Sequence, residues 1–186
     1  MTLFIGEHNL DSVLVMHGTT DTVKHPKKLF REMTLANLLS AQQIIPEMKS
    51  TERWDAIVEI ASMLISQGKI QKKDEKNILT ALRQREETMS TGIGYGIAIP
   101  HASSDCVLDV VAGFGRSSKG IPFDALDNEP VHFIVLFIVP RDQFQTHLRT
   151  LAAIAKFLND RNVREDLAKA QDPQQILKVF TTRASQ

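Results

Sequence analysis

The chain is organised around residues 90–101, which read STGIGYGIAIPH. Glycine stands at three alternate positions within it, Gly92, Gly94 and Gly96. Glycine lets backbone approach backbone or a ligand closely, so this spacing predicts a tight loop whose N–H groups can hold an anion. The apolar residues 97–99 predict a short buried strand, which Pro100 ends because proline has no N–H to donate. His101 is therefore expected at a strand end, where α/β folds usually carry their chemistry.

The glycine spacing alone fits no common nucleotide motif. The dinucleotide pattern G-x-G-x-x-G needs two residues between its last two glycines, and here there is only one. No lysine follows in the position that a phosphate-binding P-loop requires. Judged by spacing alone, His101 is as readily a structural histidine as a functional one.

Composition narrows the class of protein. The chain of 186 residues is long enough for one ordinary domain with a small extension. Its 22 basic and 22 acidic side chains balance, which gives no electrostatic reason to expect nucleic acid or an acidic membrane as a partner. Cys106 is the only cysteine, so no intrachain disulfide can form and a cysteine-based zinc site is not expected. No apolar run approaches the ~20 residues of a membrane helix, and no signal-peptide pattern opens the chain, so we expect a cytoplasmic protein.

Hydrophobic periodicity predicts helices and strands on both sides of the glycine stretch. Residues 1–32 are expected to form an N-terminal extension, partly ordered or linker-like, and residues 33–186 a single domain. Helices are predicted at 50–67, capped by Ser50 or Thr51 and ended by Gly68, at 72–85, from His147 onward, and from Pro173 with Asp172 as its cap. A strand is predicted at 107–114, where Gly113 and Gly115 indicate a bulge or a strand end. The nearly continuous apolar run 131–139 predicts a central strand buried on both faces.

The whole segment 86–102, EETMSTGIGYGIAIPHA, closely resembles the active-site signature of the EIIA components of the phosphotransferase system, in the fructose–mannitol class (EIIA type-2). The resemblance extends from about residue 33 to residue 180. It implies that His101 carries a phosphoryl group on Nε2, since the histidine of the Ile-Pro-His segment does so in that family. It further implies that Arg85 steadies the phosphoryl group and that His147 assists His101. Ala102 replaces a glycine that many members carry, a substitution within the range of the family.

Phosphoryl transfer to histidine needs a neutral ring nitrogen as nucleophile, which imidazole supplies because its pKa lies near ~6.5. It also needs hydrogen-bond donors for the phosphoryl oxygens. The candidates for these donors are Arg85 and the loop residues Thr91, Gly92, Gly94 and Gly96. Without the resemblance, Arg85 would be interpreted as an exposed helix-end residue and His147 as a surface histidine at a helix N-terminus. Glu86 is expected to have a structural role, pairing near the loop.

The family fold implies an α/β protein, a single-domain sandwich with a mixed parallel and antiparallel sheet flanked by helices. The implied function is a phosphohistidine carrier that accepts its phosphoryl group from an HPr- or NPr-like protein. Residues 147–156 look most like the stand-alone nitrogen-regulatory form, EIIA-Ntr, which would control target proteins by its phosphorylation state. The alternative is a sugar-specific EIIA that passes phosphate to a fructose- or mannitol-type EIIB. A metal-dependent hydrolase using His101 and His147 is a minor alternative, because carboxylate ligands are missing nearby. We expect no cofactor, no metal, no nucleic acid and no membrane insertion.

Overall fold

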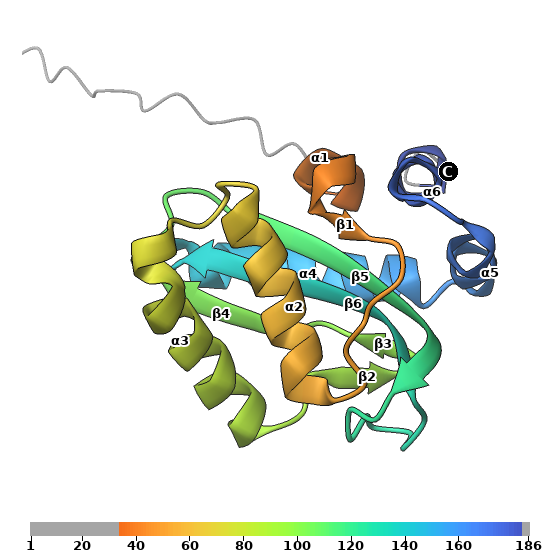
Figure 1. The fold of residues 1–186 in the computed structure, drawn as a ribbon, viewed down its shortest axis with the longest axis horizontal. Helices are drawn as coiled ribbons and strands as arrows, with labels where there is room; N and C mark the ends of the chain where they lie inside the picture. Colours follow the sequence, from red (N-terminus) through yellow and green to blue (C-terminus); the bar gives the residue numbers. More distant parts are fainter. Residues whose placement is uncertain (1–33, 184–186) are drawn as a thin grey trace, which may run out of the picture. The chain divides into compact units, whose positions relative to one another are not determined.

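Strand β6 (Val131–Pro140) lies in the middle of a six-stranded sheet in the computed structural model, which describes residues 34–183 (Figure 1). The other strands are β1 (Ile44–Ile45), β2 (Gly92–Gly94), β3 (Ile97–Ala98), β4 (His101–Ser104) and β5 (Val111–Ile121). The strand order is β1-β5-β6-β3-β2, and β4 also pairs with β6. The β5–β6 and β2–β3 pairs are antiparallel, whereas the β1–β5, β3–β6 and β4–β6 pairs are parallel. The predicted α/β class with a mixed sheet is confirmed.

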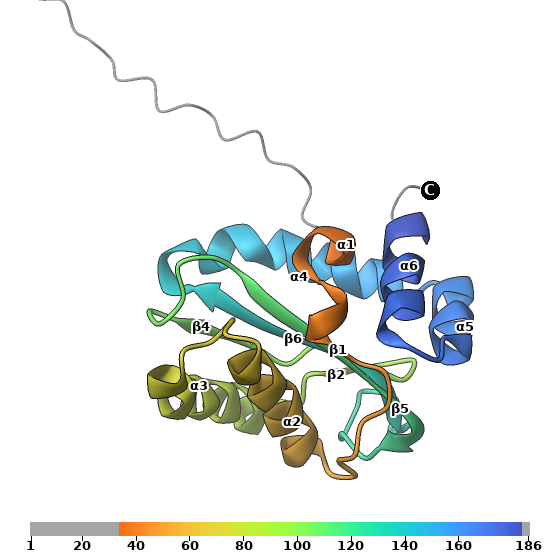
Figure 2. The same cartoon turned by 45° about the horizontal axis from the view of Figure 1, so that its top comes forward.

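Helices cover both faces of this sheet. They are α1 (Leu35–Leu38), α2 (Arg53–Ser66), α3 (Glu75–Thr88), α4 (Phe144–Leu158), α5 (Arg161–Lys169) and α6 (Pro173–Arg183). Figure 2 shows α2 and α3 below the sheet and α4 and α6 above it. No helix within residues 34–183 is long and apolar enough to cross a membrane.

The central strand supplies both hydrophobic cores. Ile134, Leu136 and Ile138 pack with the apolar residues of α2 and α3. Phe133, Val135 and Phe137 pack with those of α1 and α4–α6. Successive side chains of a strand point to opposite faces, so a strand between two helical layers is apolar at nearly every position. The prediction of a buried central strand at 131–139 is therefore confirmed.

The predicted break at Pro100 does not end the strand region. β3 pairs with β6 before Pro100, where Ile97 stands opposite Phe133, and β4 pairs with the same strand after it, where His101 stands opposite Phe137. The carbonyl oxygen of Pro100 accepts a hydrogen bond from the Phe137 amide at 2.9 Å. Proline lacks only a donor, and its carbonyl continues the ladder. His101 thus begins a second short strand instead of lying beyond a strand end.

The expected cap of the helix at 50–67 is wrong. Helix α2 begins at Arg53, after an N-cap residue, Glu52, whose side chain makes no capping bond. The hydroxyl and amide of Ser50 instead bind Oε2 of Glu59, at 2.6 and 2.9 Å. The expected end is confirmed, because Gly68 follows α2 with a φ of +67°.

The glycines of β5 serve a different purpose from the predicted bulge or strand end. Gly113 and Gly115 lie inside β5, and the irregular register falls between Arg116 and Ile121. A Cβ on Gly113 would lie 2.7 Å from Cγ2 of Ile60, and one on Gly115 would lie 2.5 Å from the sulfur of Met48. These glycines therefore permit close packing on one face of the sheet. The predicted extension, residues 1–32, lies outside the described residues, and its boundary stays a prediction.

Candidate active site

His101 is half-buried at the start of β4, and its two ring nitrogens have different partners. Nδ1 lies 2.8 Å from the carbonyl oxygen of Ile99. Because a carbonyl oxygen only accepts hydrogen bonds, Nδ1 carries the ring proton. Nε2 then keeps its lone pair, which accepts a hydrogen bond from Nε of Arg85 at 3.2 Å. The two partners together specify a neutral imidazole whose basic nitrogen is Nε2.

Arg85 reaches His101 from the last turns of α3, which runs to Thr88, three residues beyond the predicted end. Its Nη1 donates to the carbonyl oxygen of Met89 at 2.8 Å. The guanidinium group is thus anchored at the end of its own helix while Nε contacts the imidazole. The structure brings together two of the predicted site residues, Arg85 and His101.

The surroundings of His101 favour its neutral form. Burial lowers the pKa of His101 below the ordinary value of 6.5, and the positive charge of Arg85 lowers it further. The hydrogen bond to Ile99 and the negative charge of Glu86 act in the opposite direction. The net pKa is lowered because removing an imidazolium ion from water is unfavourable. Nε2 is therefore unprotonated at neutral pH.

Helix α4 begins beside this histidine. The ring of Phe144, its first residue, stacks on His101 with a centroid distance of 6.4 Å and an interplanar angle of 24°. His147 follows three residues later, so the two side chains lie on the same side of the first turn. Sequence reasoning started this helix at His147 and missed Phe144. The i, i+3 spacing of two ring side chains was the available signal, but the same spacing is common in ordinary core positions.

His147 is buried, with 6 % of its surface exposed. Its Nε2 lies 3.4 Å from Oε1 of Gln143, a long contact, and within the described part of the chain its Nδ1 has no hydrogen-bond partner. Burial lowers the pKa of His147 from 6.5. No hydrogen bond among residues 34–183 joins His147 to His101; the element that relates them is the first turn of α4.

The glycine stretch forms a hairpin of β2 and β3 whose turn has positive φ values of 90° at Gly94, 55° at Tyr95 and 75° at Gly96. The Tyr95 amide donates to Oδ2 of Asp127 at 2.7 Å, and the Gly92 amide donates to the Ser90 hydroxyl at 3.1 Å. These amides are therefore already occupied within the protein.

The amide of Thr91 is occupied as well, since it donates to Oε1 of Glu86 at 3.0 Å. The anion-binding role expected for Thr91, Gly92, Gly94 and Gly96 stays a prediction, and the geometry favours a scaffolding role for this stretch. The pairing near the loop that was expected for Glu86 is confirmed by its two hydrogen bonds with Thr91.

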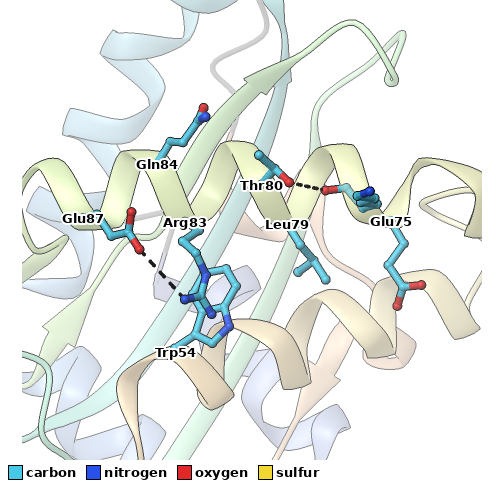
Figure 3. Close-up of a pocket in the computed structure, with 8 residues that line it drawn as sticks. Trp54, Glu75, Leu79, Thr80, Arg83, Gln84 and Glu87 are labelled. Atoms are coloured by element: carbon cyan, nitrogen blue, oxygen red, sulfur yellow. Dashed lines mark hydrogen bonds and ion pairs between the residues drawn. The ribbon is translucent and has the colours of Figure 1, made fainter.

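A groove of about 410 Å³ lies between α2 and α3, and neither Arg85 nor His101 lines it (Figure 3). It is lined by Trp54, Glu75, Lys76, Leu79, Thr80, Arg83, Gln84 and Glu87. The guanidinium of Arg83 lies 4.1 Å from the centroid of the Trp54 ring, and its Nη1 lies 3.9 Å from Glu87. Arg83 and Arg85 are thus two arginines of one helix with different surroundings, and only Arg85 contacts His101. Within residues 34–183 no group of three or more His, Cys, Asp or Glu side chains is placed to hold a metal ion.

Comparison with known proteins gives a consistent result. The family model described as "Phosphoenolpyruvate-dependent sugar phosphotransferase system, EIIA 2" matches residues 37–182. The "PTS system fructose-specific EIIA component" of Haloferax volcanii is 36% identical over 125 residues, which cover 67% of this chain and 80% of that protein. The "Nitrogen regulatory protein" of Bradyrhizobium diazoefficiens is 29% identical over 148 residues, which cover 80% of this chain and 95% of that protein.

The fold has solved relatives too. The crystal structure of the nitrogen regulatory protein IIA-Ntr from Neisseria meningitidis superposes with a TM-score of 0.70, at 24% identity, over 78% of this chain and 97% of that one. At this identity the likeness shows a shared fold. Neither the relatives nor the site supports the metal-dependent hydrolase. The resemblance drawn from residues 86–102 is confirmed: this chain belongs to the EIIA type-2 family of the phosphoenolpyruvate-dependent sugar phosphotransferase system.

Proposed function

We propose that this protein is a phosphohistidine carrier that accepts a phosphoryl group on Nε2 of His101 from an HPr- or NPr-like phosphocarrier. The main support is the arrangement of the ring, with Nδ1–H held by the Ile99 carbonyl at 2.8 Å and the Nε2 lone pair directed toward Arg85. In the transfer, the lone pair of Nε2 forms the new bond to phosphorus while the bond from phosphorus to the donor breaks. No proton has to leave Nε2, because that nitrogen carries none.

The backbone contact at Nδ1 becomes more favourable as the reaction proceeds. When Nε2 bonds to phosphorus, the ring still carries the Nδ1 proton and gains positive charge. A hydrogen bond from a charged donor is roughly twice as strong as a neutral one. Because this charge develops while the bond from Nε2 to phosphorus forms, the Ile99 carbonyl is expected to stabilise the transition state more than the free ring, which is the differential stabilisation that catalysis requires.

Arg85 is proposed to exchange its hydrogen bond to His101 for hydrogen bonds to the phosphoryl group. In the free protein its Nε–H occupies the lone pair of His101 at 3.2 Å, so this bond must be released before phosphorus can approach. The guanidinium group has five N–H donors in a planar fork that suits phosphoryl oxygens. Its anchor on the Met89 carbonyl, 2.8 Å away, lets it stay near the site during this exchange.

His147 and the N-terminus of α4 are proposed to assist at the phosphoryl group on His101, in addition to Arg85. The N-terminal end of a helix carries a partial positive charge that favours anions. Phe144 stacks on His101, so this end lies beside the phosphoryl acceptor. His147 is buried in the same turn with one ring nitrogen unpartnered within residues 34–183, and we propose that it assists by hydrogen bonding to the phosphoryl group.

We propose a cytoplasmic, nitrogen-regulatory role, in which the phosphorylation state changes which target protein is bound. The relative named as a nitrogen regulatory protein supports this role, because the match covers 95% of its length. The second candidate is a sugar-specific EIIA that passes its phosphoryl group to an EIIB domain of the fructose or mannitol type. The fructose-specific relative, at 36% identity, favours that candidate.

The test is phosphorylation by Enzyme I, HPr and isotope-labelled phosphoenolpyruvate. The parent protein should take up label that is labile to acid, and His101→Ala should take up none. His132→Ala is the matched control, because His132 is a second half-buried histidine with a backbone carbonyl at Nδ1, and it should label like the parent. Absence of label on the parent with every HPr-type donor would refute carriage. Discharge of the labelled protein by an EIIB domain would favour sugar transport over regulation.

A further inference from the structure

We propose that Glu86 is a positioning residue for His101, which holds the imidazole in its reactive orientation through Thr91 and Ile99. This inference rests on the proposed function of His101 and adds a residue to its machinery. Glu86 makes no hydrogen bond to the imidazole itself. It acts on the opposite ring nitrogen from Arg85, through a continuous series of hydrogen bonds.

The first link joins Glu86 to Thr91. The Glu86 side chain is 5 % exposed, and its two carboxylate oxygens accept from the Thr91 amide at 3.0 Å and from the Thr91 hydroxyl at 2.6 Å. A buried carboxylate needs such donors, since an ionised group out of water is otherwise strongly unfavourable. Arg53 lies 3.9 Å from the same carboxylate and pairs with Asp124 at 2.9 Å. Glu86 thus fixes Thr91 at both its backbone and its side chain.

The second link passes from Thr91 to the histidine. The Thr91 carbonyl accepts from the Ile99 amide at 3.0 Å, and the Ile99 carbonyl accepts from Nδ1 of His101 at 2.8 Å. Between Ile99 and His101 stands Pro100, whose φ is restricted by its ring and whose carbonyl is bonded to the Phe137 amide. With so little freedom in this segment, the direction of the Ile99 carbonyl depends on the position of Thr91.

Arg85 and Glu86 are neighbours on α3, and successive side chains of a helix point about 100° apart. One therefore reaches Nε2 of His101 directly, and the other enters the protein toward Thr91. The last turns of a single helix hold the ring from both nitrogens. Within residues 34–183 the Ile99 carbonyl is the one hydrogen-bond partner of Nδ1. If that bond is lost, the proton can move to Nε2, and molecules with the proton on Nε2 have no lone pair there to attack phosphorus.

The test compares Glu86→Ala with Glu86→Gln. Glutamine can accept from the Thr91 amide and donate to its hydroxyl, so it keeps both bonds without the charge. Glu87→Gln is the control, because Glu87 is the next carboxylate on α3 and is exposed, pairing with Arg83 at 3.9 Å. Circular dichroism establishes that each variant is folded. If the alanine variant does not fold, Thr91→Val replaces it, since valine removes the hydroxyl bond and keeps the amide bond.

Two measurements are made on each variant. The first is the ¹⁵N spectrum of the His101 ring at alkaline pH without any donor, which reports the nitrogen that carries the proton. The second is the initial rate of labelling. Glu86→Ala should show a new population with the proton on Nε2 and a rate lowered roughly 10- to 100-fold, the size usual for lost outer-shell partners. Glu86→Gln and Glu87→Gln should resemble the parent in both.

The proposal is overturned if Glu86→Ala leaves the proton on Nδ1 and the rate unchanged. It is equally overturned if Glu86→Gln is as slow as the alanine variant, since charge and not hydrogen bonding would then be responsible. The ring spectrum needs no phosphoryl donor, so the positioning role of Glu86 and the proposed phosphoryl carriage can be refuted independently. If the parent protein takes up no label but Glu86→Ala still shifts the ring proton of His101, phosphoryl carriage is refuted and the positioning role of Glu86 is retained.

Discussion

His101 and His132 hold their imidazole rings in the same way. In each, Nδ1 donates to a backbone carbonyl oxygen 2.8 Å away, that of Ile99 for His101 and that of Ser117 for His132. Both are half-buried and both lie near one end of a strand. The rings therefore share one tautomer, with the lone pair on Nε2.

The two histidines differ at Nε2. That of His101 meets the guanidinium of Arg85 at 3.2 Å, and its ring stacks on Phe144 at the start of a long helix. That of His132 faces Gly120, where an added Cβ would lie only 3.2 Å away. The backbone amide of His132 also binds the Gly96 carbonyl at 2.7 Å, which ties the hairpin to β6. A fixed tautomer is thus shared by both histidines, and the surroundings of the second ring nitrogen are what distinguishes them.

The largest expected effect comes from Arg85→Gln, which would leave His101 with its tautomer but without the guanidinium group at Nε2. We expect the initial labelling rate to fall about 100- to 1,000-fold, the usual cost of one lost donor to a developing negative charge. Rapid-quench labelling measures it. Arg83→Gln is the control, because Arg83 stacks on Trp54 in the groove of Figure 3, and it should label at the parent rate. Equal rates for the two variants would remove Arg85 from the site.

The next effect concerns His147. We expect His147→Asn to lower the labelling rate about 100-fold, the lower end of the range usual for a positioned proton donor or acceptor. Gln143→Ala is the matched control, since Gln143 makes only a 3.4 Å contact with the His147 ring, and it should change the rate less than about threefold. A variant of His147 that is folded and labels at the parent rate would show that His147 does not assist His101.

A smaller effect is the pH dependence of His101. Its pKa is lowered by burial and by Arg85, so the ring loses its proton at a lower pH than the ordinary 6.5. At pH 6 a free imidazole is only about a quarter neutral, and His101 should exceed that fraction. Its nucleophilic form should persist further into acid. An NMR titration of the ring measures the pKa directly, and Arg85→Gln should move it upward. A parent value at or above 6.5 would contradict the expectation.

The smallest effect on labelling is expected at Gly120, beside His132. Its φ is +79°, and an added Cβ would lie 2.7 Å from Cβ of Pro130 and 3.0 Å from Cε1 of His132. Gly120→Ala should label at the parent rate yet lose stability to chemical denaturant. The matched control is Gly68→Ala, at φ +67° with nothing within 4 Å of the added Cβ. The control should cost roughly 1–2 kcal/mol for the backbone strain, and Gly120→Ala roughly 1–3 kcal/mol more for crowding. Equal losses of stability in the two variants would show that Pro130 and His132 can shift to make room for the added Cβ.

Prediction from the sequence was best where a local pattern reports burial. The apolar run 131–139 identified β6, because a strand covered on both faces is apolar at successive positions. Gly68 marked the end of α2, because the residue after a helix often adopts a left-handed conformation, which glycine tolerates best since it has no Cβ. The glycine stretch was harder to interpret. Its N–H groups suggested anion binding, but Glu86 and Asp127 already occupy the amides of Thr91 and Tyr95. Asp127 lies 32 positions from Tyr95, and no local pattern reveals such a partner.

Reading the sequence alone was enough to identify the family, the central strand and, through the Ile-Pro-His segment, the histidine to examine. The family, His101 with its Nε2, and Arg85 came from the resemblance of residues 86–102 to a known signature, whereas the strand came from local hydrophobicity; neither inference needs the fold. The folded structure supplies what no local pattern contains, namely the hydrogen-bond partners of the two ring nitrogens of His101 and the link from Glu86 through Thr91 and Ile99. The physical reason is that a hydrogen bond requires two atoms within about 3 Å. Packing of α3 and α4 against the sheet, not proximity in the chain, determines which atoms come that close.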